Sequence, residues 1–164
     1  MIYTLANADE NVEFDDILSY IPKRKNIRFS IILPTYNESK LIRKIINNIS
    51  DVLKSENFEI IVVDDMSPDN TADIVKELIQ SHKNITLLSR KKRGVFSAQQ
   101  DGSKIAAGRY LVLMDADFSH NPNDLPRLIQ EIDKGYSFVI GSRYVPGGTI
   151  PTSWSLLRKA NSSL

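Results

Sequence analysis

The sequence predicts an α/β domain in which a mainly parallel sheet is flanked by helices. Short apolar runs rich in β-branched residues recur at residues 29–33, 59–63, 85–88, 110–114 and 138–140. Each of the first four is followed by a longer segment with helical periodicity, at residues 41–53, 72–79, 96–106 and 125–132. Apolar strands that alternate with amphipathic helices are typical of βαβ units, whose sheet is buried on both faces.

Composition narrows the function classes. The chain has 164 residues, which fits one domain, and its 21 Lys and Arg against 20 Asp and Glu give no reason to expect a nucleic-acid partner. Without cysteine, disulfides, thiolate nucleophiles and cysteine-ligated zinc are excluded, and with two histidines a metal would need oxygen ligands. The apolar runs are shorter than the ~20 residues of a spanning helix, and no signal peptide is recognised, so we expect a cytoplasmic location.

Residues 1–27 differ from the rest and are predicted to be an N-terminal extension, with the domain at 28–164. Acidic residues come first in this segment and a basic cluster follows them. Its four apolar residues at helical spacing predict a short amphipathic helix packed on the domain: Phe14, Ile17, Leu18 and Ile21.

Carboxylates gather where the predicted strands end. The first strand is followed by residues 34–38, the second by Asp64 and Asp65, and the fourth by Asp115 and Asp117. Ligands bind at the carboxyl ends of the strands in open parallel sheets. Because carboxylates repel one another unless a cation or a donor-rich ligand lies between them, this clustering favours a binding site over a scaffold.

The chemistry of these residues points to a nucleotide and a metal. Asp115 and Asp117 can reach one point after a buried strand and suit Mg²⁺ or Mn²⁺ bound together with a diphosphate. A carboxylate at the end of the second strand can accept from the ring N–H of a base, and Tyr36 offers an aromatic face or a hydroxyl. Ser67 and Asp69 are predicted to cap the next helix.

Four ordered motifs resemble family 2 glycosyltransferases, and most of all the polyprenyl- or dolichyl-phosphate mannose and glucose synthases. They are 30–38 (SIILPTYNE), 62–71 (VVDDMSPDNT), 114–117 (MDAD) and 141–148 (GSRYVPGG). The similarity runs from about Arg28 to the C-terminus. It implies a GT-A, Rossmann-like fold, a nucleotide-sugar donor such as GDP-mannose or UDP-glucose, Mg²⁺ or Mn²⁺ as cofactor, and inverting transfer of a hexose, with mannose preferred.

The resemblance also assigns roles to residues. It implies that the nucleotide sugar is bound by Pro34, Tyr36, Glu38, Val63, Asp64, Asp65, Asp115 and Ala116. It implies that the metal is bound by Asp115, Asp117 and Ser119, and that the catalytic residues are Asp117, Arg143 and Arg158. The lipid-phosphate branch often has glutamine at the position of Ser119, so the shorter hydroxyl puts the identity or coordination of the metal in question.

The acceptor implied by the resemblance is a polyprenyl or dolichyl phosphate. With a second pKa near ~6 a phosphate is already ionised at neutral pH, so it needs no general base, whereas a hydroxyl acceptor would need one. No base stands out after Gly148. The resemblance implies a catalytic domain of ~200 residues or more, so the chain is expected to be truncated or short at its C-terminus. A UDP-sugar transferase with a hydroxyl acceptor and an inactive donor-binding fragment remain alternatives.

Two other classes of protein fit the sequence less well, and one basic segment has two possible interpretations. A receiver domain would carry its acidic pair after the first strand, and a nucleotidyltransferase would carry a glycine-rich loop there, whereas residues 34–38 contain no glycine. The basic run 90–93 predicts a solvated loop or, alternatively, a contact with phosphate or an anionic membrane surface. The second reading places the protein at the cytoplasmic face of a membrane.

Overall fold

The computed structural model describes residues 2–4, 24–91, 94–145 and 148. The chain divides into two compact units, Met1–Asn123 and Asp124–Leu164. The first unit carries a sheet, three helices and a pocket, and the second carries one helix among its described residues.

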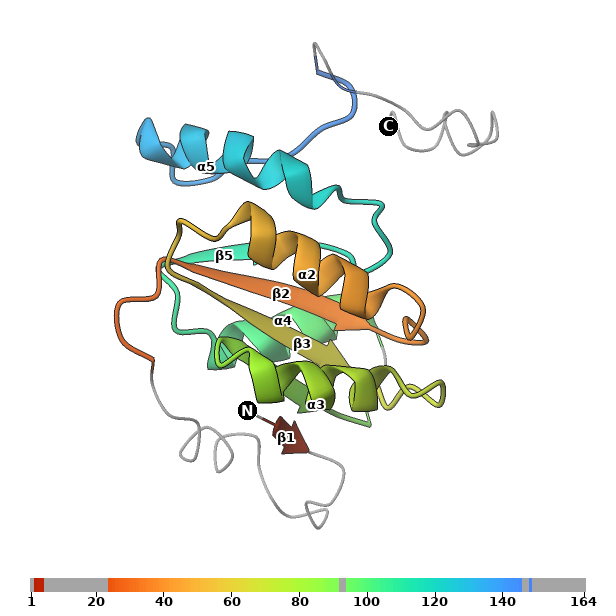
Figure 1. Ribbon diagram of the computed structural model, residues 1–164. Helices are drawn as coiled ribbons and strands as arrows, with labels where there is room; N and C mark the ends of the chain where they lie inside the picture. The colour runs from red at the N-terminus through yellow and green to blue at the C-terminus, as the bar shows by residue number, and fades with distance from the viewer. Residues whose placement is uncertain (1, 5–23, 92–93, 146–147, 149–164) are drawn as a thin grey trace. The chain divides into compact units, whose positions relative to one another are not determined.

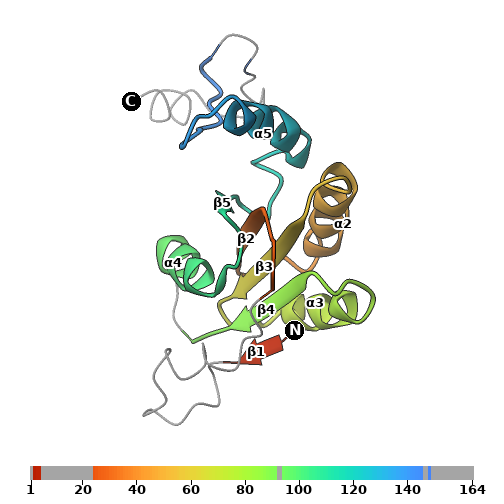
Figure 2. The ribbon, with the colours of Figure 1, turned by 90° about the vertical axis from the view of Figure 1, so that its left-hand side faces the viewer.

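The first unit is built on a five-stranded sheet in which every pairing is parallel (Figure 1), with strand order β1-β4-β3-β2-β5 (Figure 2). The strands are β1 Ile2–Thr4, β2 Phe29–Thr35, β3 Phe58–Asp64, β4 Ile85–Ser89 and β5 Tyr110–Leu113. Four of the five strands predicted from the sequence are therefore confirmed. The chain runs outward from β2 through β3 to β4 and then places β5 on the other side of β2. This reversal creates a switch point between β2 and β5, where α/β sheets bind ligands.

Helices cover both faces of the sheet, with α2 and α3 on one face and α4 on the other (Figure 2). They span α2 Ile42–Val52, α3 Thr71–Ser81 and α4 Val95–Ile105, which confirms the three helices predicted for this part of the chain. Double coverage explains why β2, β3 and β4 are almost entirely buried and carry continuous apolar runs. In α2 the buried residues recur at helical spacing: Ile42, Ile45, Ile46 and Ile49.

Helix α4 lies unusually close to the sheet because it carries a glycine there. A Cβ at Gly102 would stand 2.6 Å from Cγ2 of Ile32 and 3.1 Å from Cγ2 of Val63. Ile32 and Val63 belong to a buried cluster that also includes Ala98 and Ile105 of α4. The close approach holds α4 against β2 and β3, and the first residue of this helix, Val95, lines the pocket.

The second unit confirms the predicted helix, α5 Leu125–Asp133, but not the predicted strand at 138–140. Phe138 and Ile140 are 80% and 71% exposed, and no described residue pairs with their backbone. A strand is stable only when a neighbour takes its N–H and C=O groups, so the apolar run alone was not sufficient. Within the part of the chain that the structure describes, no helix is long and apolar enough to cross a membrane.

The predicted N-terminal extension contributes β1, which the sequence pattern did not reveal; β1 pairs with β4 through Ile2 and Leu87. The helix expected around residues 14–21 lies outside the described residues. Arg24, near the end of the extension, donates to the backbone carbonyls of Lys83 and Asn84 at 2.9 and 2.8 Å and pairs with Glu59 at 3.1 Å. These bonds anchor it where β3 and β4 begin.

Candidate active site

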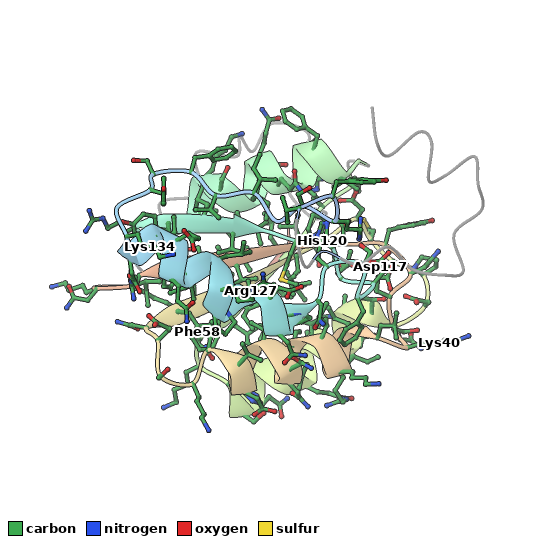
Figure 3. The ribbon with its side chains drawn as sticks, turned by 90° about the horizontal axis from the view of Figure 1, so that it is seen from above. Lys40, Phe58, Asp117, His120, Arg127 and Lys134 are labelled. Atoms are coloured by element: carbon green, nitrogen blue, oxygen red, sulfur yellow. The ribbon has the colours of Figure 1, made fainter. Side chains whose placement is uncertain are left out.

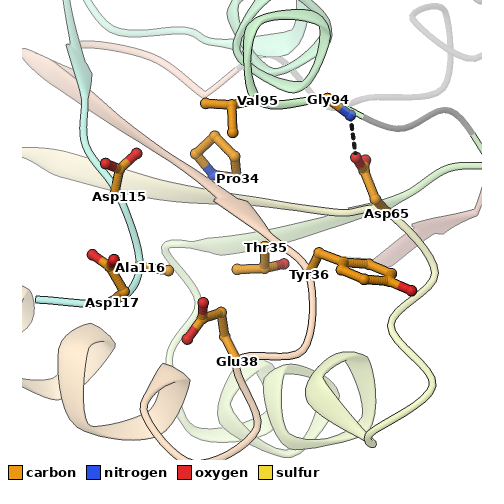
Figure 4. A pocket seen from close by; sticks show the side chains of 10 residues that line it. All are labelled: Pro34, Thr35, Tyr36, Glu38, Asp65, Gly94, Val95, Asp115, Ala116 and Asp117. Carbon is orange, nitrogen blue, oxygen red and sulfur yellow. Dashed lines mark hydrogen bonds between the residues drawn. The ribbon is translucent and has the colours of Figure 1, made fainter. Parts of the chain in front are cut away.

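A pocket of about 380 Å³ opens at the carboxyl ends of β2, β3 and β5, next to the first residue of α4 (Figure 4). Its volume lies in the range of small-molecule sites. The residues that line it are Pro34, Thr35, Tyr36, Glu38, Asp65, Gly94, Val95, Asp115, Ala116 and Asp117. The side-chain view from above shows Lys40 and Asp117 at this end of the sheet, with Phe58, the first residue of β3, at the other end (Figure 3).

Most residues predicted to bind the nucleotide sugar are brought together here. Pro34, Tyr36, Glu38, Asp65, Asp115 and Ala116 all contribute to the lining, and so does Asp117, which was predicted to hold the metal. Sequence reasoning missed Thr35, Gly94 and Val95. For Gly94 a signal existed, since it separates the basic run from a helical segment, but that signal did not show which way the loop turns.

The loop that carries Glu38 is held by three consecutive backbone amides. Asn37 N–H donates to Ser67 Oγ, Glu38 N–H to Thr71 Oγ1 and Ser39 N–H to Asp69 Oδ2, each at 3.0 Å. The acceptors all come from the loop after β3 and the first residue of α3. Asp69 also accepts from Thr71 N–H, but the N-cap position of α3 is occupied by Asn70, and no side-chain capping hydrogen bond is made there. The motif 67–71 therefore fixes the loop after β2 next to the start of α3.

Asp64 and Val63 lie behind this loop and do not line the pocket. Asp64 is fully buried, and its carboxylate accepts from Thr35 Oγ1 at 3.0 Å and from Ser67 N–H at 2.9 Å. Val63 packs into the core cluster under α4. Asp64 thus helps to hold the two loops and Val63 belongs to the core, and the nucleotide contact implied for these residues stays a prediction.

The carboxylates beside β2 and β5 influence one another. Burial raises the pKa of Glu38, and the negative charges of Asp117 and Asp69 raise it further. Burial also works to raise the pKa of Asp117, but hydrogen bonds from the backbone and hydroxyl of Ser119 outweigh it and leave that pKa below its usual value. Asp117 is thus kept ionised next to Glu38, and the repulsion between them would be relieved by a cation.

The loop after β5 holds Asp115 and Asp117 through its own hydrogen bonds. Ser119 N–H donates to Asp117 Oδ1 at 2.8 Å, and Ser119 Oγ lies 3.3 Å from Asp115 Oδ2. His120 Nδ1 accepts from Asp115 N–H at 3.0 Å, so the proton of the neutral ring is on Nε2. Between these residues Phe118 has φ 62°, a strained value for a bulky side chain.

These oxygen ligands fit a divalent cation that is shared with a substrate. Within the described residues, no three His, Asp or Glu side chains are grouped as a metal cage. Asp115, Asp117 and the Ser119 hydroxyl instead offer a partial set on one side of the pocket. Mg²⁺ and Mn²⁺ are commonly bound in this way, by one or two carboxylates together with phosphate oxygens.

On the other side of the pocket Asp65 is held by the buried side chain of Arg90 and by the backbone of the exposed Gly94. Arg90 Nε donates to Asp65 Oδ1 at 2.7 Å, and Gly94 N–H donates to Asp65 Oδ2 at 3.0 Å (Figure 4). The prediction of a solvated loop at 90–93 is wrong for Arg90, whose side chain is buried. Its guanidinium is neutralised by Asp65 and Asp101 and does not face a phosphate or a membrane.

The two arginines predicted to bind phosphate are not tested by this geometry. Arg143 belongs to the second unit and is partly exposed there, and Arg158 lies outside the described residues. Their roles stay predictions.

A parallel α/β sheet with helices on both faces and a carboxylate-lined pocket at its switch point is the arrangement of a Rossmann-like domain. Residues 30–162 match the family profile described as "Glycosyl transferase family 2", and the chain belongs to this family. The arrangement of sheet and helices is that of the GT-A fold, as the sequence predicted.

Relatives and solved structures support the same assignment. The chain is 40% identical over 133 residues to the dolichol-phosphate mannosyltransferase of Pyrococcus furiosus, covering 81% of this chain and 38% of that relative. A mannosyltransferase of Pyrobaculum calidifontis, solved with GDP-Man and Mn²⁺, gives a TM-score of 0.56 at 26% identity over 71% of this chain and 38% of that one. S. aureus TarS 1–349 in complex with UDP gives 0.55 at 30% identity over 66% and 32%. The chain therefore spans about two fifths of the length of the Pyrococcus furiosus relative.

Proposed function

We propose that this chain binds the donor in a metal-dependent, inverting hexosyl transfer from GDP-mannose to a polyprenyl or dolichyl phosphate. The observation that carries the proposal is the pocket itself, in which the carboxylates of Glu38, Asp115 and Asp117 lie across from Asp65 and Tyr36. One side suits a metal diphosphate and the other suits a base. A mannosyltransferase solved with GDP-Man and Mn²⁺ is among the structures with the same fold.

In this proposal the pocket residues bind and orient the donor. Asp115 and Asp117 hold the cation, which when bound stabilises the charge that develops on the departing diphosphate. Asp65 accepts from the base, and Tyr36 contributes its ring or hydroxyl at the same side. Glu38, whose raised pKa reflects burial and the neighbouring Asp117, is placed to accept from a hydroxyl of the donor.

The transfer is a single displacement. An oxygen of the acceptor phosphate forms a bond to the anomeric carbon while the bond from that carbon to the diphosphate breaks, and GDP leaves with the electron pair. Attack on the opposite face inverts the configuration. Because the acceptor is ionised at neutral pH, no residue has to remove a proton. A membrane-bound acceptor lipid would place the reaction at the cytoplasmic face of a membrane, with Arg143 and Arg158 as phosphate contacts.

A UDP-sugar donor is the second candidate, supported by the fold shared with TarS, which was solved with UDP. The test is to incubate the chain with Mn²⁺ or Mg²⁺, GDP-mannose or UDP-glucose, and a polyprenyl phosphate, and to look for lipid-linked sugar. Calorimetry with GDP and with UDP measures donor binding separately, so a donor-binding fragment without turnover is recognised.

Asp117→Ala should abolish transfer and metal-dependent GDP binding, because it removes a carboxylate that would hold the cation. Asp51→Ala is the matched control, since Asp51 is an exposed aspartate on α2 that does not line the pocket. Equal GDP binding by both variants and by the unaltered chain, with and without Mn²⁺, would contradict the proposed metal site. No binding of either nucleotide by the unaltered chain would refute the proposed function.

A further inference from the structure

Three charged side chains are buried together directly behind the wall of the pocket. Arg90, Asp65 and Asp101 are 1%, 8% and 4% exposed. Arg90 Nε reaches Asp65 at 2.7 Å, its Nη1 reaches Asp101 Oδ2 at 2.9 Å, and its Nη2 reaches Gly94 O at 3.1 Å. Of the three, Asp65 lines the pocket, while Arg90 and Asp101 do not.

Fold stability alone does not explain this cluster. Removing charges from water is costly, and well-packed apolar residues often replace a buried ion pair without loss of stability. Here two carboxylates face one guanidinium, so a negative charge is left over, and Lys104 approaches it from the surface at 3.3 Å from Asp101 Oδ1. Such an arrangement is retained more readily where it fixes the geometry of a functional group.

The group that the cluster fixes is the carboxylate of Asp65. Its Oδ1 accepts from Arg90 and its Oδ2 accepts from Gly94 N–H. Arg90 also donates to the carbonyl oxygen of the same Gly94. A carboxylate has about four acceptor positions, and each oxygen of Asp65 accepts one bond from the part of the chain that the structure describes, which leaves one position on each for a ligand in the pocket. Two neighbouring free positions suit a base edge with two adjacent donors, as in guanine, better than one with a single ring N–H, as in uracil.

We propose that Asp101, acting through Arg90, is a positioning residue that orients Asp65 toward the nucleobase of a guanosine diphosphate donor. The proposal rests on the proposed function, which makes Asp65 the acceptor of the base. Asp101 lies in the middle of α4, so this helix supports the base side of the pocket from behind. The diphosphate side depends on the loop after β5 and is not part of this chain of contacts.

Asp101→Asn tests the proposal, because it keeps the shape of the side chain and removes the charge that anchors Arg90. Calorimetry with Mn²⁺ present compares three ligands: GDP, UDP and inorganic pyrophosphate. We expect GDP affinity to fall by about tenfold, the effect of misplacing one hydrogen bond to a charged group, with pyrophosphate affinity changed less than about twofold. The preference for GDP over UDP should shrink accordingly.

Lys104→Met is the matched control, since it removes the other cation beside Asp101 and leaves the contact with Arg90; its GDP affinity should be unchanged. If Asp101→Asn does not fold, Arg90→Lys is used instead. It keeps the buried positive charge but loses the forked guanidinium that joins Asp101 to Gly94, and its affinities for GDP, UDP and pyrophosphate are compared in the same way. Parallel losses for GDP and pyrophosphate, or no loss for either, would overturn the proposal. If the unaltered chain binds no nucleoside diphosphate, the proposed function fails instead.

Discussion

Thr71→Val is the change that most directly tests how the pocket loop is held. Thr71 is fully buried at the start of α3, and its Oγ1 accepts from Glu38 N–H at 3.0 Å and donates to Asp69 Oδ1. Valine has nearly the same shape but can make neither bond. Thr71→Ser keeps both bonds and loses only a methyl group, so the two variants separate hydrogen bonding from packing.

The expected cost follows from these contacts. Losing the bond from a partly buried N–H costs about 1 kcal/mol, and losing a bond to a carboxylate costs about 1.5–3 kcal/mol. Water can reach the partly exposed Asp69, which reduces the second figure, so we expect Thr71→Val to lower the free energy of unfolding by about 2–3 kcal/mol. Removing one buried methyl group in Thr71→Ser costs about 1 kcal/mol.

The assay is urea unfolding of both variants, with an NMR titration of Asp69. Burial works to raise the pKa of Asp69, but the Thr71 hydroxyl and nearby amides lower it to about 2. A lowered folded pKa contributes stability above pH ~4 that is lost as the pH falls toward 2. Thr71→Val should raise this pKa, so the difference in free energy of unfolding between this variant and the unaltered chain should shrink as the pH falls from ~4 toward 2. Equal destabilisation by valine and serine, or an Asp69 pKa still near 2 in Thr71→Val, would refute the reasoning.

Three further predictions concern packing, charge and metal binding. Gly108→Ala would place a Cβ 2.5 Å from Ser30 Oγ and 2.6 Å from Ser30 N, so we expect a loss of about 3 kcal/mol in urea unfolding; a loss below about 1 kcal/mol would contradict this packing. Glu38→Gln should stabilise the protein at pH 7 but not at pH 4, because burial and then Asp117 raise the pKa of Glu38 above 4.5 and stability is lost as the pH rises through it. Unfolding at the two pH values tests this, and an equal effect at both would count against it. Ser119→Ala should weaken Mn²⁺ binding more at pH 5 than at pH 7, since it removes a hydrogen bond that, against the effect of burial, lowers the pKa of Asp117. Calorimetry at both pH values would disprove this if the ratio of affinities to the unaltered chain stayed constant.

The sequence predicted the parts of the fold that depend on local periodicity. Strands β2 to β5 and their helices follow from apolar runs and helical spacing within each segment. The pocket was predictable because its residues, such as Tyr36, Asp65 and Asp117, sit at strand ends, and parallel strands bring those ends to one edge.

What escaped prediction depends on partners distant in the chain. Arg90 belongs to a basic run that looks solvated, yet Asp65, 25 residues earlier, and Asp101, 11 residues later, make its burial favourable. Asp64 and Asp65 are adjacent in sequence but face different partners, which a pair of identical residues cannot reveal. The run at 138–140 has the composition of a strand but no neighbour among the described residues, and β1 is too short to show a pattern.

The pairing of β2 with β5 has a consequence for the order in which the protein folds. Ser30 and Gly108, joined by a hydrogen bond at 2.8 Å, are 78 residues apart, whereas β3 and β4 follow β2 at shorter separations. Closing a longer loop costs more chain entropy, and non-local pairings slow folding. Glu38 therefore meets Asp115 and Asp117 only after a longer closure than those that pair β2 with β3 and β3 with β4, so recovery of the proposed donor binding during refolding should lag behind recovery of helical signal.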